Sequence, residues 1–255
     1  MNMLKLGILA SESLSEFRVN TLLPFLSDKN FELKVAFIDK RPKKTIKQKL
    51  RKNFKRGRGG YMLVMALKSI LAKKEATVDT REFCNEKGIE VIETIKPYSK
   101  EFIETVKSYD LDALLLAGGY GIVKTPLLEA SRLGVISYHH GNMRTYRGMP
   151  PGLWELYNNE KEMGVTVQIL SPGLDCGIPV EERNVIIKKN DTVATLEKRA
   201  LKESEDMLHK ALVRLSNPTF TPQKLESFGR VYTLPNMTQW IKLNLKIWSR
   251  KMKLS

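Results

Sequence analysis

The stretch DALLLAGGYGIVKTPLLEASRLGVISYHHGN, residues 112–142, decides the fold class of this chain. It contains two short apolar runs, DALLLA (112–117) and GVISYHH (134–140), which are typical of buried strands. The first run ends in a glycine-rich loop, and the second ends in two of the three histidines of the whole chain. Strands that are apolar along their length belong in a parallel sheet, where helices cover both faces.

Further apolar runs alternate with helical segments on both sides of this stretch. Ser11 or Ser13 is placed to cap the first helix, and Gly88 to end a later one. The alternation predicts a Rossmann-like α/β fold, a mostly parallel sheet with helices on both faces. We expect strands at 5–10, 32–39 and 89–93, helices at 79–87 and 100–109, antiparallel additions at 164–170 and 178–187, and one long amphipathic helix at 192–215.

The positive charge of the chain is confined to two segments. The net charge is +15, yet residues 40–58 carry eleven basic residues and 230–255 carry six, both without a single acidic one. The remainder is close to neutral. We therefore divide the chain into an α/β domain at 1–215, with a basic insertion at 40–74, and a basic C-terminal extension at 216–255.

Such basic segments are either solvated charge runs or contact sites for an anionic partner. Residues 40–58 lead into glycines at 57, 59 and 60, which suggests a hinged, mobile lid that attracts a phosphate-bearing substrate. Replacing Lys43, Lys44, Lys47 and Lys49 would test this lid. The tail has an apolar stripe that either packs on its own domain, the favoured reading, or lies on an anionic membrane. The stripe consists of Met237, Ile241, Leu245, Trp248 and Met252.

Composition also narrows the class of protein. No apolar run is long enough to span a membrane, and the first residues lack the pattern of a signal peptide. Cys84 and Cys176 make no disulfide framework, so we expect reduced thiols and a cytoplasmic protein. Adjacent histidines project to opposite sides of a strand, so we expect no metal site, and His209 is expected to be structural.

Three loops carry the chemistry: 117–126, the segment after His139, and 171–179. Each follows an apolar strand, so we expect them to meet at the carboxyl ends of the strands. Asp175 lies between two glycines in GLDCG, where the backbone can turn tightly. A carboxylate that faces a histidine is the ordinary arrangement for acid–base chemistry. The glycines at 118–121 do not form a dinucleotide fingerprint, and they suggest backbone groups open to a flat heterocycle.

The order LAG-x-x-x-I, His…Tyr-Arg-Gly, Gly-Val-Thr-Val and Gly-Leu-Asp-x-Gly resembles the folate-dependent formyltransferases. This group acts on glycinamide ribonucleotide, methionyl-tRNA and sugar nucleotides. The resemblance implies transfer of a formyl group from 10-formyltetrahydrofolate to a primary amine, without a metal. It implies a pterin pocket lined by Ala117, Gly118, Gly119, Tyr120, Gly121, Ile122, Val123, Gly173 and Leu174.

The resemblance also implies roles for residues near the double histidine. His139 and Asp175 match the catalytic histidine and aspartate of the family, whereas the family asparagine corresponds to Ser137. Asn142 is a substitute oxyanion donor in the same loop. On the substrate side we expect His140, Arg147 and Gly148.

The acceptor is left open by the sequence. We expect a small, anionic amine, either phosphorylated or a nucleotide-linked amino sugar. A purine-pathway acceptor is disfavoured because the first strand–helix turn has no glycine. Nucleic acid, as initiator tRNA, is disfavoured because only some forty residues follow the long helix. The alternatives are a methionyl-tRNA formyltransferase, a formyl-folate hydrolase, or a catalytically retired folate-binding homologue. The oligomeric state is also open.

Overall fold

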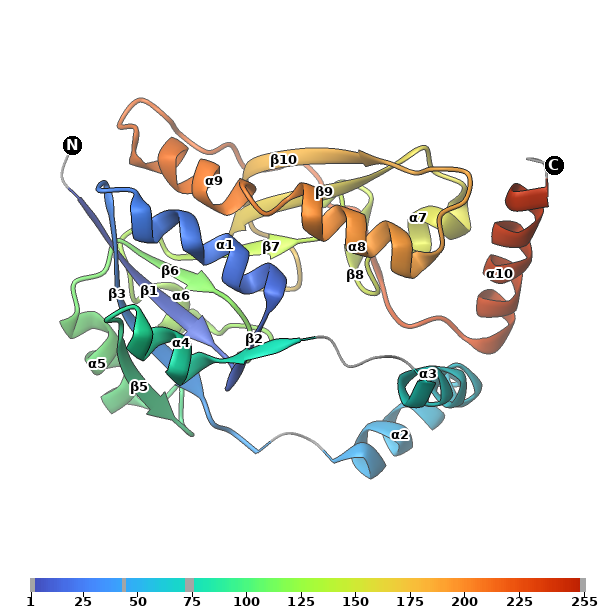
Figure 1. Ribbon diagram of the computed structural model, residues 1–255, viewed down its shortest axis with the longest axis horizontal. Coiled ribbons are helices and arrows are strands. Elements are labelled where there is room, and N and C mark those ends of the chain that lie inside the picture. The colour runs from blue at the N-terminus through green and yellow to red at the C-terminus, as the bar shows by residue number, and fades with distance from the viewer. Residues whose placement is uncertain (1–2, 43–44, 72–75, 253–255) are drawn as a thin grey trace.

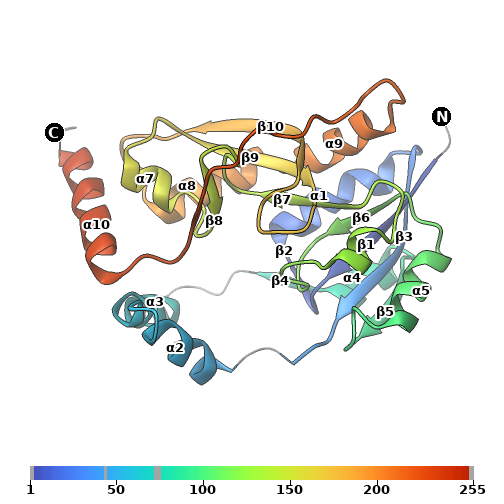
Figure 2. The same ribbon diagram turned by 180° about the vertical axis from the view of Figure 1, so that it is seen from behind.

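The computed structural model describes residues 3–42, 45–71 and 76–252, and its centre is a twisted sheet (Figures 1 and 2). Within these residues the sheet has seven strands in the order β10-β9-β7-β6-β1-β3-β5. The strands are β1 (Leu4–Ala10), β3 (Phe31–Asp39), β5 (Glu90–Thr94), β6 (Ala113–Leu116), β7 (Val135–His139), β9 (Glu162–Ile169) and β10 (Ile178–Ile186).

The pairing confirms a mostly parallel sheet with an antiparallel end. Strands β7, β6, β1, β3 and β5 pair in parallel with one another in this order. Strand β9 pairs antiparallel with β7, and β10 pairs antiparallel with β9. Ile136 opposes Ile169 and His139 opposes Thr166. The carboxyl ends of β6 and β7 therefore lie side by side, as expected for the site.

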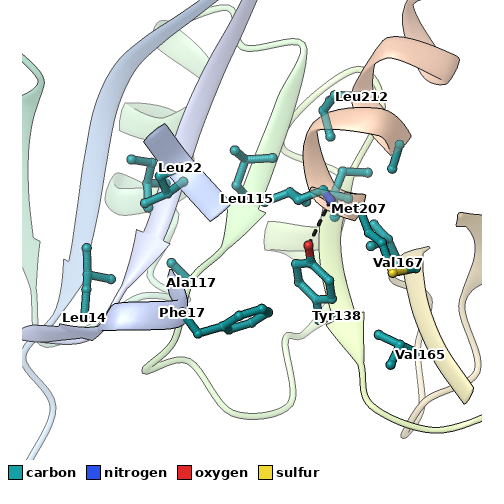
Figure 3. Close-up of a cluster of buried hydrophobic side chains, with 14 of the residues drawn as sticks. Leu14, Phe17, Leu22, Leu115, Ala117, Tyr138, Val165, Val167, Met207 and Leu212 are labelled. Carbon is teal, nitrogen blue, oxygen red and sulfur yellow. Dashed lines mark hydrogen bonds between the residues drawn. The ribbon is translucent and has the colours of Figure 1, made fainter. Parts of the chain in front are cut away.

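Helices cover both faces of this sheet and create two apolar cores. Along β1, Leu6 and Ile8 face one core while Leu9 faces the other, as strand alternation requires. Figure 3 shows the first core, where α1 and α9 meet the sheet. On this side lie α1 (Glu16–Ser27), α4 (Thr80–Glu86), α8 (Val193–Glu203) and α9 (Met207–Ser216), and on the other α5 (Lys100–Ser108) and α6 (Thr125–Leu128).

Two expectations about these helices are wrong. Ser15 caps α1 by accepting from Arg18 N–H at 3.4 Å, because the chain first forms the short strand β2 (Ser13–Ser15), which pairs with β4 (Thr77–Asp79). The segment at 192–215 forms two helices and not one long helix. The buried Tyr138 hydroxyl makes hydrogen bonds to the backbone groups that are left unpaired at the break between them. It donates to Ser204 O at 2.7 Å. It also accepts from Leu208 N–H at 2.9 Å, which is the dashed line at Tyr138 in Figure 3.

The basic insertion is a helical hairpin that lies away from the sheet (Figures 1 and 2). It consists of α2 (Ile46–Phe54) and α3 (Gly59–Leu71), joined by a turn in which Gly57 has φ +68°. Gly59 and Gly60 belong to α3, so these two glycines form a helix start and not the expected hinge. Lys43 and Lys44 lie outside the described residues, so the lid stays a prediction.

The C-terminal extension returns to the domain in two places. Strand β11 (Arg230–Tyr232) pairs in parallel with β8 (Tyr146–Gly148), directly after the double histidine. Helix α10 (Met237–Met252) then packs near α7 (Leu153–Asn158) and α3. In the described residues, no helix is both long and apolar enough to cross a membrane.

The favoured packing of the apolar stripe of α10 is wrong. Leu245 and Trp248 in this stripe are about three-fifths exposed, at 60% and 62%. The helix packs through Leu243 and Ile247, which are buried on another face. Lys246 lies beside this face, where Nζ donates to Tyr157 O at 2.5 Å.

Candidate active site

His139 is the last residue of β7, and its side chain is buried at 6% exposure. Nε2 lies 2.8 Å from the backbone carbonyl oxygen of Tyr146. A carbonyl oxygen can only accept, so this contact assigns the ring proton of neutral imidazole to Nε2. Nδ1 is then the nitrogen that can exchange a proton with its surroundings.

Asp175 reaches His139 from the loop of the β9–β10 hairpin. Because β9 is antiparallel to β7, the carboxyl end of β9 lies beside Ile136, away from His139. The sequence predicts that all three loops start at the same edge of the sheet. This prediction is wrong for the Asp175 loop, which starts at the opposite edge. It folds back beside β7 (Figure 2), with φ of +118° at Gly173 and +48° at Asp175. This fold-back, and not the strand direction, brings the carboxylate to the histidine.

The Asp175 carboxylate is held by a backbone hydrogen bond and also faces the His139 ring. Oδ2 accepts from Gly148 N–H at 2.7 Å, and Oδ1 lies 3.4 Å from His139 Nδ1. The second distance is longer than a direct hydrogen bond, which is common in acid–base sites without substrate. Gly148, expected on the substrate side, has φ +90° and positions Asp175 through its backbone.

Gly141 allows the ring to sit where it does. A Cβ atom at this position would lie 2.5 Å from His139 Nε2 and 2.9 Å from Tyr146 O. Real Cβ atoms essentially never approach so closely, and the carbonyl is part of the backbone. A glycine is therefore required after the double histidine, because any side chain at this position would displace the His139–Tyr146 contact.

A small pocket lies at His139 and Tyr146, and we call it the catalytic pocket after the role that the sequence predicts for His139. Its volume is about 10 Å³, which is room for roughly one water molecule. Both histidines line it, and so do residues of β8, α7 and β11. The lining residues are His139, His140, Tyr146, Arg147, Gly148, Met149, Pro150, Trp154, Glu155 and Tyr232.

His140 lies on the other side of the strand from His139, as expected from alternation. Its ring stacks on Tyr138, with centroids 5.5 Å apart and planes 13° apart. Burial, the largest cause, and the charges of Arg18 and His139 together lower the pKa of His140 to about 3. Nε2 is buried without a hydrogen-bond partner among the described residues. His140 is therefore a neutral ring near physiological pH.

Glu155 is a member of the pocket that sequence reasoning missed. It lies in α7 and is buried at 3% exposure. Burial, the largest cause, and the charge of Glu160 raise the pKa of its carboxyl, a backbone N–H lowers it, and the net pKa is about 7. A carboxyl that titrates near neutrality in the same pocket as His139 can bind or exchange a proton of a ligand. One acidic residue in the apolar run GLWELY was the available signal.

The glycine-rich loop after β6 is divided between core and surface. Ala117, Tyr120 and Val123 are buried, and the Tyr120 hydroxyl donates to Phe37 O at 3.1 Å. The other members of 117–123 are Gly118, Gly119, Gly121 and Ile122, and all three glycines have positive φ. Ile122 is 61% exposed, and Leu174 in the Asp175 loop is 38% exposed.

This division fits the expected pterin pocket. Gly119 and Gly121 are exposed and can offer backbone groups, and a Cβ at Gly121 would meet nothing within 4 Å. The exposed apolar side chains, Ile122 and Leu174, offer the contact that a flat heterocycle needs. Tyr120 and Val123 anchor the loop, because their side chains are buried in the second apolar core.

Three other expected residues lie elsewhere or are already engaged. Asn142 lines a separate cavity of about 170 Å³, and its Oδ1 accepts from Arg144 N–H at 2.9 Å. Ser137 is buried two residues before His139, on the same side of β7, and its hydroxyl donates to Tyr138 O at 3.3 Å. The structure does not bring Asn142 to the His139 pocket.

Arg147 clamps the Asp175 loop. Its guanidinium donates to Gly229 O at 2.7 Å, to Leu174 O at 3.3 Å and to Cys176 Sγ at 2.7 Å. With these bonds made, Arg147 acts on the site mainly by positioning the loop. Among the residues described, no group of three or more His, Cys, Asp or Glu side chains is arranged to hold a metal ion.

Comparisons with known proteins point to one enzyme family. A methionyl-tRNA formyltransferase of Ruminiclostridium cellulolyticum is 30% identical over 165 residues, 63% of this chain and 53% of the relative. Glycinamide ribonucleotide transformylase 1 from Symbiobacterium toebii has a TM-score of 0.62 at 18% identity, covering 91% of this chain and 94% of that one. An N-formyltransferase from Helicobacter canadensis, in complex with folinic acid and dTDP-3-aminofucose, has a TM-score of 0.60 at 17% identity, covering 96% and 81%.

These solved structures share the fold, and the chain spans about half the length of the curated relatives it matches. The family model described as formyl transferase matches residues 34–212, which includes the double histidine and the Asp175 loop. Members of this family are folate-dependent enzymes. Because the matched region is more than half of the sequence, this chain belongs to the formyl transferase family.

Proposed function

We propose that this protein transfers the formyl group of 10-formyltetrahydrofolate to a primary amine of a small, anionic acceptor. Family membership supports the donor and the reaction type. The observation that carries the proposal is the His139–Asp175 pair, with Oδ1 3.4 Å from Nδ1 and the carboxylate held by Gly148 N–H.

The reaction needs one proton to change place. The amine nitrogen attacks the formyl carbon, a C–N bond forms, and the carbonyl electron pair moves to oxygen. His139 takes the amine proton at Nδ1, where Asp175 stabilises the resulting imidazolium. The positive ring stabilises the oxyanion and then returns the proton to the folate nitrogen as its bond to carbon breaks. A well-placed oxyanion donor is worth about 10²–10³ in rate, and Ser137 is the candidate beside His139.

The formyl donor, 10-formyltetrahydrofolate, would bind along the glycine-rich loop, and the amine would approach the His139–Asp175 pair from the opposite side. Backbone groups of Gly119 and Gly121 would hold the heterocycle, and Ile122 and Leu174 would cover it. Arg147 keeps the Leu174 segment in place through its bond to Leu174 O. We leave Asn142 out of the catalytic group because its carboxamide belongs to another cavity.

An amino sugar linked to a nucleotide, or another phosphorylated amine, is the acceptor that we favour. The basic residues at 40–58 and 230–255 complement such a ligand in charge. Transfer RNA is the alternative acceptor, and formylation of charged initiator tRNA by the purified protein would favour it. Contact of the extension with an anionic membrane stays a prediction, and sedimentation with anionic liposomes tests it.

The test is a search for a formylated amine. Purified protein is incubated with 10-formyltetrahydrofolate and a metabolite extract, and products are sought by the mass of one formyl group replacing one hydrogen. We expect product with wild type and a loss of about 10²-fold or more in His139→Asn. Equal product with wild type and His139→Asn would show that this site does not carry the transfer.

Hydrolysis of formyl-folate is a second candidate, favoured by one observation. The catalytic pocket has room for roughly one water molecule, so water could take the place of the amine. Formate release without any acceptor, at a rate that acceptors do not increase, would establish the hydrolase. Folate binding with neither formate nor formyl-amine would indicate a retired homologue, and Ser137→Asn would then test whether the family residue restores turnover.

A further inference from the structure

A second and much larger cavity lies next to the catalytic pocket. Its volume is about 370 Å³, within the range of small-molecule sites. Three arginines line it, Arg56 and Arg58 from the α2–α3 turn and Arg230 from β11. We call this space the arginine cavity. It is formed by α7 together with the basic insertion and the C-terminal extension, the two segments that carry the excess charge of the chain.

The two cavities share a wall. Trp154 and Tyr232 line both of them, and their rings lie 5.1 Å apart between centroids. The wall is fixed, because Trp154 Nε1 donates to Thr233 O at 3.0 Å and Tyr232 belongs to the β8–β11 pair. A ligand could therefore extend from His139 across an aromatic surface into the arginine cavity.

The three guanidinium groups are available to an anion. In the part of the chain that the structure describes, no carboxylate lies within salt-bridge distance of Arg56, Arg58 or Arg230. Arg58 Nη2 donates to Thr233 Oγ1 at 2.6 Å, which orients its guanidinium and leaves other N–H groups free. Arg230 lies over the Tyr232 ring at 5.7 Å. Cations without counterions around one cavity favour a multiply charged ligand.

The turn that carries two of these arginines is ordered by its own backbone. Asn53 O accepts from Arg56 N–H at 3.1 Å and from Arg58 N–H at 3.0 Å. Gly57 supplies the positive φ of +68° between them. The turn therefore presents both side chains toward the cavity as a preformed pair.

We propose that the arginine cavity binds the phosphate or diphosphate group of the acceptor, while its amine reaches His139. The fork of N–H groups on arginine matches phosphate oxygens in pairs, and phosphate attracts several arginines at once. Trp154, Tyr157 and Tyr232 offer aromatic faces for a sugar or a base. The volume exceeds that of a single phosphate, which points to a nucleoside diphosphate ester. The placement of the amine at His139 rests on the proposed function. The binding of the anion in the arginine cavity does not.

Direct binding tests the cavity without catalysis. Nucleoside diphosphates with each of the common bases, inorganic pyrophosphate and inorganic phosphate are titrated into the full-length protein by calorimetry at low salt. We expect a nucleoside diphosphate to bind more tightly than pyrophosphate, because only the former reaches the aromatic wall. Pyrophosphate binding as tightly would show that the aromatic part of the site is wrong.

Three variants locate the binding. Arg56→Gln, Arg58→Gln and Arg230→Gln should each raise the dissociation constant about tenfold or more, the usual weight of a charge-assisted hydrogen bond. Arg51→Gln is the matched control, an exposed arginine of α2 in the same insertion that does not line the cavity. Arg58→Gln also removes the bond to Thr233, so Arg56→Gln and Arg230→Gln decide if that variant misfolds.

The two proposals fail in different ways. Arginine-dependent diphosphate binding without any formyl transfer would support the cavity and count against the proposed reaction. Formyl transfer whose acceptor KM is the same in wild type and in Arg56→Gln/Arg230→Gln would overturn the cavity and leave the reaction intact. Diphosphate binding that is equally weak in wild type, the three variants and Arg51→Gln would overturn it as well.

Discussion

Replacing Glu155 by glutamine should change how stability depends on pH. The carboxyl is buried at 3% exposure and its pKa rises from 4.5 to about 7. The folded state therefore holds this proton more tightly than the unfolded state. Stability is full below the unfolded pKa and declines as the pH rises toward the folded pKa, because ionisation of the buried group is costly.

The magnitude follows from the shift. A difference of 2.5 pKa units corresponds to about 3 kcal/mol, at roughly 1.4 kcal/mol per unit. Relative to the Glu155→Gln variant, wild type should thus lose about 3 kcal/mol of unfolding free energy between pH of about 4.5 and about 8. Glutamine keeps the shape of the protonated carboxyl and does not ionise, so the comparison isolates one group.

Urea unfolding at a series of pH values measures this difference. Glu86→Gln is the control, because Glu86 is an exposed glutamate at the end of α4. Its difference from wild type should stay nearly constant over the same range. The reasoning would be refuted if Glu155→Gln and wild type showed parallel stability curves, since the carboxyl would then ionise equally easily in both states.

Three further predictions concern the surroundings of the site. Gly141→Ala places a Cβ 2.5 Å from His139 Nε2, so formyl transfer should fall by about 10²-fold while circular dichroism shows a folded protein. Tyr138→Phe leaves two buried backbone groups at the α8–α9 break without their partner, so chemical denaturation should show a loss of about 2 kcal/mol. Burial raises the pKa of the Cys84 thiol to about 11, so iodoacetamide should label the more accessible Cys176 at least about tenfold faster, as peptide mapping would reveal.

The sheet could be predicted because its strands are short apolar or alternating runs. Such a pattern can be recognised from neighbouring residues alone. The runs at 5–10 and 134–140 became β1 and β7, and the alternating runs at 164–170 and 178–187 became the antiparallel strands β9 and β10. What periodicity could not show was the break in the helix at 192–215. The hydroxyl that serves this break comes from Tyr138, more than sixty residues earlier in the chain.

The candidate site was predictable only in part. The motifs around His139 and Asp175 identified the pair, although the direction of β9 showed that the Asp175 loop must fold back to reach it. Glu155 has only a weak signal in the sequence, one acidic residue in an apolar run, and its burial is seen only in the structure. The stripe of α10 shows that periodicity finds an apolar face without saying whether anything covers it. Asn142 shows that closeness in sequence to His139 is not closeness in the pocket.

The central claim is that Asp175 and His139 together carry the formyl transfer, and one comparison tests it most directly. Asp175→Asn is measured beside Asp110→Asn, because both aspartates have φ +48° and asparagine tolerates this conformation equally well. The Asp110 side chain is 94% exposed on a loop away from the catalytic pocket. In single turnovers with saturating 10-formyltetrahydrofolate and the amine, we predict a rate about 10²-fold or more below wild type for Asp175→Asn and an unchanged rate for Asp110→Asn. An Asp175→Asn rate equal to that of wild type would contradict the account.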